Sequence, residues 1–270
     1  MCTGRGTQVW TYAALRARHG RRQIERQVRG GTLVKVRRGV YATAAACVEV
    51  MTAAAHGGVL GCESAARHLG IWGLDEPALH VWMHHDRHQY PHEDCDCVTH
   101  WDAATSGSAF EQPGVPLVLR QIYGCRGAEA FFVALESARR LGLIDAVGLR
   151  RLGDRLGPEG RDLIAFSRAD ADSGLESLVR LRVRRHGWRV RTQVGVVGTG
   201  RVELLIDDWL IIETDGRANH EESSLRHRDL VRDATAAGWG HPTLRFDYAM
   251  VLHDWPLVER AIVETMRRRP

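Results

Sequence analysis

This sequence lacks long apolar runs and a recognisable export signal, and it has almost no lysine. No uncharged apolar run reaches about 18 residues, the length needed to span a bilayer. The first residues, MCTGRGTQVW, have no apolar core of the kind found in signal peptides. We therefore expect no membrane partner and a cytoplasmic location. Lys35 is the one lysine, so nearly all 37 basic side chains are arginines, a ratio on which we place no functional weight.

Cysteine is sparse, with six residues in a chain of 270. Without an export signal, this number does not indicate a disulfide framework, and we expect reduced thiols. The length and the 44% hydrophobic content allow two or three domains, because globular domains have about 100–200 residues each. We therefore expect a multi-domain α/β protein.

Basic charge is concentrated near the start of the chain. Residues 1–45 hold ten arginine or lysine side chains and one acid, Glu25, a distribution typical of a phosphate-binding surface. Helical spacing over 11–20 and 21–31 is followed by a strand pair that turns at Arg38 and Gly39. Two short helices and a basic hairpin predict a winged helix-turn-helix domain over 1–48.

In a winged helix, the second helix enters the major groove of DNA while the wing contacts phosphates. The wing tip would present Arg37 and Arg38. The expected base readers and backbone contacts on the second helix are Arg21, Arg22, Gln23 and Arg26. The alternative is a solvated basic helix on a small domain that binds protein.

Residues 49–170 show mostly helical patterns, apart from one strand-like run over 78–85, and predict a mostly helical middle domain without a visible catalytic constellation. Four histidine or cysteine side chains from its densest cluster could hold structural zinc. Cys-x-Cys is not typical zinc spacing, however, and we favour a solvated histidine-rich loop. The cluster consists of His80, His84, His85, His88, His92, Cys95, Cys97 and His100.

The pattern changes after residue 170, where helical and strand-like runs alternate. Together they predict a separate α/β domain over 171–270, in the order α-β-β-β-α-β-α. The expected elements are a helix at 173–187, strands at 188–197, 201–206 and 209–216, a helix at 220–238, a strand from 243 and a closing helix at 255–269.

Acidic residues occupy particular places on these elements. Glu176 lies on the first helix, and Glu203 lies in the second strand. Because strand side chains alternate between faces, Glu213 and Asp215 share a face of the third strand, and the turn through 207–209 would bring Glu203 to it. Clustered carboxylates are unfavourable without a cation, so we expect Mg²⁺ or Mn²⁺ there. The alternative is that these acids face solvent on an edge hairpin.

The segments SGLES, RVELLI, IIETDGRANH, HRDLVRD, GW and TLRFDY occur in this order within 173–248. As an ensemble they resemble the domain of unknown function related to the very-short-patch-repair endonucleases, a branch of the PD-(D/E)XK nuclease superfamily. The resemblance covers roughly the last 100 residues. It implies a restriction-endonuclease-like α/β fold and hydrolysis of phosphodiester bonds.

The same resemblance implies roles for single residues. Asp215 stands where the superfamily has a lysine, His220 would handle protons or contact phosphate, and Arg228 would contact phosphate. The branch usually has aspartate in place of Glu203, and the extra methylene would move a ligand by about 1 Å, enough to weaken activity. The metal ligands implied are Glu176, Glu203 and Glu213.

Residues 1–45 and the segment GCESAARHLGIWGL also resemble the winged-helix antitoxin domain of the abortive-infection type (AbiEi-like). Such domains occur fused to nuclease-like domains, which implies a DNA target.

These patterns favour a divalent-metal-dependent DNA endonuclease or nickase, targeted by its N-terminal winged helix. The alternative is a non-catalytic DNA-binding transcriptional regulator or antitoxin whose nuclease fold is degenerate. RNA stays open as a substrate, because the carboxylate chemistry does not depend on the sugar.

Overall fold

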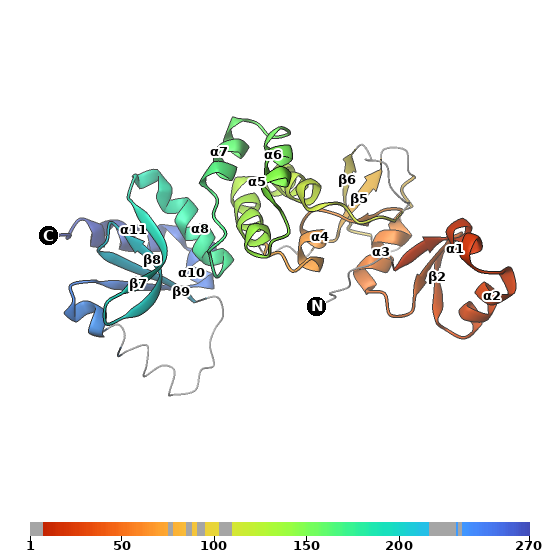
Figure 1. Cartoon of the computed structure of the whole chain (residues 1–270), viewed down its shortest axis with the longest axis horizontal. Helices are drawn as coiled ribbons and strands as arrows, with labels where there is room; N and C mark the ends of the chain where they lie inside the picture. Colours follow the sequence, from red (N-terminus) through yellow and green to blue (C-terminus); the bar gives the residue numbers. More distant parts are fainter. Residues whose placement is uncertain are drawn as a thin grey trace. The chain divides into compact units, whose positions relative to one another are not determined.

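The computed structural model of the protein describes residues 8–74, 78–84, 88–90, 95–102, 110–215, 231 and 234–270. These residues form a mixed α/β structure with three small sheets (Figure 1). Contacts along the chain define two compact units. Unit 1 is Met1–Phe131 with Ile144–Arg161, and unit 2 is Phe132–Leu143 with Asp162–Pro270. The chain therefore passes between the units three times, while the domain bounds predicted at 48 and 170 stay predictions.

Unit 1 begins with a small antiparallel sheet of order β1-β3-β2. Its first elements are β1 (Val9–Thr11), α1 (Tyr12–Arg18), α2 (Arg21–Arg29), β2 (Leu33–Arg37), β3 (Val40–Thr43) and α3 (Val48–His56). Gly39, with a φ of 77°, turns the chain between β2 and β3, a conformation that glycine adopts without strain. Thr11 caps α1 by accepting the Ala14 N–H at 3.1 Å. The core of this part is made by Leu15, Ile24 and Leu33.

A second three-stranded sheet follows in unit 1. The elements here are β4 (Val59–Leu60), α4 (Cys62–His68), β5 (His80–His84), β6 (Val98–Asp102) and α6 (Ala146–Gly153). Helix α5 (Val115–Arg140) begins in unit 1 and continues into unit 2 from Phe132. Strand β5 pairs antiparallel with β4 and parallel with β6. Glycine permits the close approach of β4 to β5, because a Cβ at Gly58 would lie 2.3 Å from the Trp82 carbonyl oxygen. The predicted run at 78–85 contains β5, whereas β6 was not expected.

Unit 2 is built on a mixed sheet of order β10-β9-β8-β7. The remaining elements are α7 (Pro158–Phe166), α8 (Gly174–Val183), a 3-10 helix (Arg184–His186), β7 (Val190–Val196), β8 (Gly200–Ile206), β9 (Leu210–Asp215), β10 (Thr243–Asp247), α10 (Tyr248–His253) and α11 (Trp255–Met266). Strands β7, β8 and β9 form an antiparallel meander, and β10 pairs parallel with β9. The helix expected at 220–238 lies largely outside the described residues, of which 231 and 234–238 are helical.

Helix α8 contacts β8 and β9, and most of its side chains are buried. Its start is capped by Ser173, whose hydroxyl accepts the Glu176 N–H at 3.1 Å. One turn after Glu176, the buried Arg180 forms an ion pair with Glu136 of α5. The Arg180 guanidinium carbon also lies 4.2 Å from the centroid of the Phe166 ring. Both ends of α8 therefore bury a charged side chain.

None of the helices described here is both long and apolar enough to cross a membrane.

Candidate functional site

Glu176 is a fully buried carboxylate in the first turn of α8. Its Oε2 accepts the Asp172 N–H and the Gln193 side-chain amide, both at 2.8 Å. Within the described part of the chain, Oε1 has no hydrogen-bond partner. Burial, and then the charges of Glu203 and Asp172, raise the pKa of Glu176 to about 8. The carboxylate is therefore held in place while one of its oxygens is left unsatisfied.

Glu203 of β8 is the second acid, and its side chain is half-buried. Its Oε2 accepts two hydrogen bonds from Thr214 of β9, one from the backbone N–H and one from Oγ1, each at 2.7 Å. The recorded pairing of β8 with β9 ends at Leu204 and Ile212, so the carboxylate binds Thr214 just beyond the ladder. Burial raises the pKa of Glu203, Thr214 opposes this, and the charge of Asp215 adds to the rise.

Electrostatic coupling defines an acidic cluster in unit 2. Glu176 is influenced by Glu203 and Asp172, and Glu203 by Asp215 and Asp172. Like-charged carboxylates of this kind favour either protonation or a bound cation. The acidic cluster, as we call it below, consists of Asp172, Glu176, Glu203 and Asp215.

The ligand atoms of the acidic cluster are not tightly gathered. Within the described ranges, the groups of three or more ligand atoms lying within 4.8 Å of one another are made of cysteine and histidine. Mg²⁺, however, usually takes only one or two protein carboxylates and keeps water or substrate phosphate as its other ligands. The unsatisfied Glu176 Oε1 beside further acids therefore fits a hydrated divalent ion, whereas the described residues do not form a complete protein cage for it.

Glu213 and Asp215 lie in different surroundings on β9. Glu213 is half-buried and Asp215 is exposed, with the buried Thr214 between them. In the parallel pairing with β10, Glu213 is in register with Arg245. Of these two acids, Asp215 is the one whose charge raises the pKa of Glu203. A metal bound jointly by Glu203, Glu213 and Glu176 stays a prediction.

The two remaining acids of this hairpin are occupied by arginines. Asp207 and Asp208 lie in the turn between β8 and β9 with positive φ values of 49° and 53°, which aspartate tolerates better than most residues. Asp207 accepts from Arg269 and Asp208 from Arg191, both at 2.9 Å. Neither carboxylate is among the charges that influence Glu176 or Glu203.

His220 and Arg228, which the family resemblance made candidates for proton handling and phosphate contact, lie outside the described residues. Their roles stay predictions.

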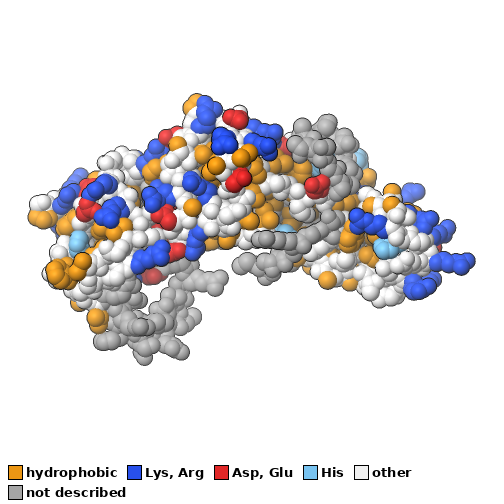
Figure 2. Space-filling view, viewed as in Figure 1, with side chains coloured by type: hydrophobic (Ala, Val, Ile, Leu, Met, Phe, Trp, Pro, Cys, Tyr) orange, Lys and Arg blue, Asp and Glu red, His pale blue; other side chains and the backbone are white. Residues whose placement is uncertain are grey.

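The basic residues expected to contact DNA are mostly exposed on α2 and the β2–β3 hairpin. Figure 2 shows Lys and Arg side chains gathered over the region of α1 and α2. Arg21 forms an exposed ion pair with Glu25 at 2.8 Å, of the weak i,i+4 kind. The fully exposed candidates are Arg21, Arg22, Gln23, Arg26 and Arg38.

Arg37 differs from its neighbour Arg38. Its Nε donates to the Ala54 carbonyl at 3.0 Å, and its guanidinium carbon lies 4.2 Å from the centroid of the Tyr90 ring. These contacts tie β2 to the end of α3. The guanidinium of Arg37 is thus engaged within unit 1, whereas Arg38 is exposed, and phosphate contact by either arginine stays a prediction.

A surface groove of about 490 Å³ lies between α2 and the β2–β3 hairpin. Ile24, Val28 and two tyrosines contribute to its lining, and Glu25 is its one acid. This arrangement suits a phosphate backbone. Arg29 and Lys35 were not singled out from sequence, since only the packing of hairpin on helix brings them together. The cations of the groove are Arg21, Arg29, Lys35 and Arg38.

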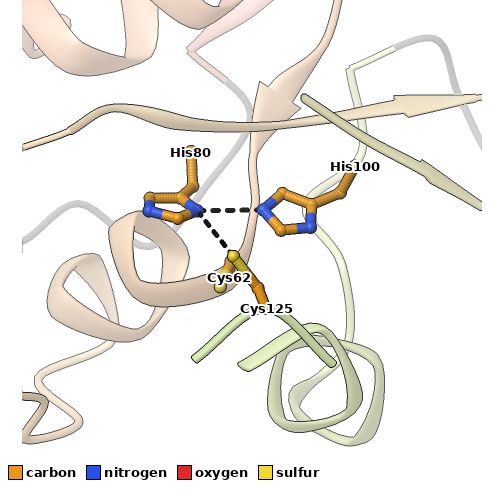
Figure 3. A group of neighbouring side chains, drawn as sticks. All are labelled: Cys62, His80, His100 and Cys125. Atoms are coloured by element: carbon orange, nitrogen blue, oxygen red, sulfur yellow. Dashed lines mark hydrogen bonds between the residues drawn. The ribbon is translucent and has the colours of Figure 1, made fainter. Parts of the chain in front are cut away.

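Part of the histidine-rich stretch is a buried strand rather than the solvated loop that we expected from the sequence, whereas His85 and His92 lie outside the described residues. His80 and His84 lie on β5 and are buried, at 1% and 6% exposure. His80 Nδ1 lies 2.9 Å from His100 Nε2, and 4.0 Å from the sulfur of Cys125. Cys62 completes the group, in which all four ligand atoms lie within 4.8 Å of one another (Figure 3).

The cysteines of this group are not those expected from sequence. Cys95 and Cys97 instead approach His56, whose Nδ1 lies 3.2 Å from the Cys95 sulfur. Burial and Cys95 raise the pKa of Cys97 to about 12. Cys47 is disulfide-bonded, which corrects the expectation of reduced thiols throughout, whereas no disulfide joins the other described cysteines, Cys62, Cys95, Cys97 and Cys125.

Comparison with known proteins gives no family assignment. No protein-family profile matches the chain, and no curated protein is significantly similar to it in sequence.

Proposed function

We propose that this protein is a divalent-metal-dependent DNA endonuclease or nickase, with a C-terminal PD-(D/E)XK-type domain and an N-terminal winged helix that binds duplex DNA. The observation that carries the proposal is the environment of Glu176. A buried carboxylate with one unsatisfied oxygen, surrounded by further acids, is stabilised best by a cation.

The acids would divide the work at this site. Glu176, which is buried, and Glu203, which is half-buried, would hold Mg²⁺ or Mn²⁺, with Glu213 as the third candidate from sequence. Such an ion would lower the pKa of an attacking water and stabilise charge on the scissile phosphate. Ser173 and Gln193 fix the position of Glu176, and Thr214 fixes that of Glu203. These hydrogen bonds hold the carboxylates in a geometry ready for the ion.

The topology of unit 2 supports the nuclease class. A helix, three strands and a further strand follow one another in the order that the sequence patterns predicted, and the structure adds that the last strand pairs parallel with the third. Glu176 lies on α8, Glu203 on β8, and Glu213 and Asp215 on β9. The acids are therefore on the first helix and on the second and third strands, the elements on which the sequence motifs placed them.

The head of unit 1 supports DNA as the target. Two short helices followed by a hairpin have the order of a winged helix, and the groove between α2 and the hairpin is lined by four cations. Each phosphate neutralised on duplex DNA lowers the slope of log K against log salt by about 0.9. Binding through this groove therefore predicts a steep salt dependence.

A cleavage assay tests the enzyme. Purified protein with Mg²⁺ or Mn²⁺ is expected to nick or cut duplex DNA, and Glu176→Gln and Glu213→Ala are expected to remove this activity without removing DNA binding. Asp208→Ala is the matched control, because it removes an acid of the same hairpin that pairs with arginine. If no form of DNA or RNA is cut while binding is retained, the enzyme assignment is wrong.

A salt-dependence experiment tests the head separately. Arg38→Ala is expected to reduce the log–log salt slope by about 1. Arg37→Ala, its neighbour in sequence, is expected to leave the slope unchanged and to lower stability instead, because its contacts are internal. Equal slopes for both variants would argue against the wing contact, and competition with single-stranded DNA and RNA at the same salt would identify the preferred nucleic acid.

One observation favours a second candidate, a DNA-binding regulator or antitoxin without catalysis. Both hydrogen bonds from Thr214 engage Glu203, and the acids do not form a complete ligand cage. In that case the salt-dependent binding is expected to persist with no metal-dependent cleavage.

A further inference from the structure

We infer that Cys62, His80, His100 and Cys125 form a structural zinc site in unit 1. This site is independent of the proposed nuclease function. Two imidazole nitrogens and two sulfurs are a donor set that zinc binds with four-coordinate tetrahedral geometry. In Figure 3 the four side chains point toward one another from separate parts of the chain.

The observed distances are close to those of an occupied tetrahedron. With Zn–N of about 2.0–2.1 Å and Zn–S of about 2.3 Å, the N–N edge is roughly 3.3 Å and the N–S edge roughly 3.6 Å. The His80 Nδ1 to His100 Nε2 distance is 2.9 Å, and the His80 Nδ1 to Cys125 sulfur distance is 4.0 Å. These two distances differ from the ideal edges by about 0.4 Å, and all other pairs of ligand atoms lie within 4.8 Å, so a small adjustment of the side chains would admit the ion.

The four ligands connect four different elements. Cys62 begins α4, His80 begins β5, His100 lies on β6 and Cys125 lies on α5. Four protein ligands leave no open position for substrate, which is typical of structural rather than catalytic zinc. The ion would therefore cross-link the second sheet of unit 1 to the two helices.

This part of unit 1 is one that would benefit from a cross-link. Its sheet has a two-residue strand, β4, and two five-residue strands, which is small for independent stability. Cys62 has a φ of 45°, a region that residues other than glycine rarely adopt, and its N–H is held by the Gln121 side chain at 2.9 Å. Such strain is typical of positions fixed for a functional reason.

Two explanations without metal compete with this inference. His80 and His100 could share a single hydrogen bond beside two incidental thiols, or Cys62 and Cys125 could oxidise to a disulfide. Neither explanation requires the two histidines and the two cysteines to meet at one point, whereas tetrahedral binding of an ion does.

The experiment uses the full-length chain carrying Cys95→Ser and Cys97→Ser, so that the second Cys/His group cannot contribute thiolates. After equilibration with Zn²⁺ and removal of excess ion, we expect about one zinc per chain by elemental analysis. Replacement by Co²⁺ should give the visible absorption of a tetrahedral thiolate site. Cys125 is exposed, so Cys125→Ser is the variant least disturbing to the core, and it should lose the bound metal.

Cys125→His keeps a zinc ligand and guards against a folding defect in the serine variant. It should retain one metal per chain, with thiolate-to-cobalt absorption reduced by about half. A chelator should lower the melting temperature of the parent and leave that of Cys125→Ser unchanged. Absence of zinc and cobalt binding in the parent, unchanged metal content in Cys125→Ser, or a Cys62–Cys125 disulfide found by mass spectrometry would each overturn the inference.

Discussion

The two ends of α8 bury the same kind of group in opposite ways. At one end Glu136 of α5 is 1% exposed and pairs with Arg180, whose guanidinium also contacts two phenylalanine rings. At the other end Glu176 is 0% exposed and is hydrogen-bonded by neutral donors beside further acids. The first carboxylate has its counter-charge within the protein, whereas the second has none among its direct partners.

This difference distinguishes a buried charge that is compensated within the protein from one that is not. A buried ion pair stays charged without help, because each partner compensates the other. Burial raises the pKa of Glu136, but the charge of Arg180 opposes that rise. For Glu176 the neighbouring carboxylates add to the effect of burial. One oxygen of each carboxylate lacks a hydrogen-bond partner among the described residues, so the two acids differ in their charged neighbours, and this difference supports the cation site that we propose at Glu176.

The largest expected effect on stability comes from breaking the Arg180–Glu136 ion pair. Glu136→Leu leaves Arg180 buried without a counter-charge and should lower the stability of unit 2 by about 3–5 kcal/mol. Glu176→Gln removes an uncompensated charge and should be neutral or stabilising above pH 8 without metal. Hydrogen exchange of the α8 amides measures both. Equal losses for the two variants would remove the distinction between the ends of α8.

The next effect is a pH dependence specific to Glu176. Its pKa is raised from 4.5 to about 8 on folding, so the folded state binds the proton more tightly. Protonation of Glu176 therefore adds up to a few kcal/mol to the free energy of unfolding. This contribution is fully present below about pH 4.5 and is lost as the pH rises toward 8. Glu203 acts in the same direction, whereas Asp170, paired with Arg168, acts near pH 2.

Comparison of wild type with Glu176→Gln isolates this contribution. Chemical denaturation from pH 5 to 9 should show a steeper loss of stability in the wild type. Identical pH profiles would mean that Glu176 does not titrate as its surroundings imply.

A smaller effect is expected from divalent ions, on the basis of the proposed function. At a concentration of 100 times the Kd, Mg²⁺ should stabilise unit 2 by about 2.7 kcal/mol, and more at pH 8 than at pH 5, where protons compete. Glu176→Gln should lose most of this gain, and Glu136→Leu should keep it. Melting curves with and without Mg²⁺ provide the measurement, and an equal response in both variants would contradict the site.

The smallest effect should come from Gln193→Ala. This change removes the side-chain amide that donates to Glu176 Oε2 at 2.8 Å. Because hydrogen bonds to a charged acceptor are the stronger ones, the loss should be about 1–2 kcal/mol at pH 9 and less at pH 5. Thr192→Val, which removes the neighbouring hydroxyl bonded to Asp170, is the control, and its effect should not depend on pH in this range.

The acidic cluster was largely accessible from the sequence. Helical and strand periodicity located α8, β7, β8 and β9, and the acids lie within about 40 residues on these consecutive elements. Alternation along β9 did not fix which acid would approach Glu203, because the pairing of β8 with β9 ends there and Thr214 takes part. Asp172 was missed because it precedes the helix and carries no periodic signal.

The Cys/His group of unit 1 could not be predicted in the same way. Its ligands are separated by between 18 and 63 positions along the chain and meet through the parallel pairing of β5 with β6. Parallel pairing of this kind depends on tertiary packing, as does the close approach at Gly58. Local spacing therefore directed attention to Cys95 and Cys97, which belong to another group. The dense histidine cluster in the sequence included His80 and His100, but nothing in the sequence marked Cys62 and Cys125 as their partners.

Because the chain crosses between its two units three times, the protein cannot be divided into them by a single cut. A fragment that starts at Asp162 contains the entire four-stranded sheet but lacks Phe132–Leu143, and with them Glu136. Such a fragment would bury Arg180 with no carboxylate beside it. The C-terminal half is therefore not a module that can be transplanted by one cut, and any graft onto another protein must also carry the preceding helical segment.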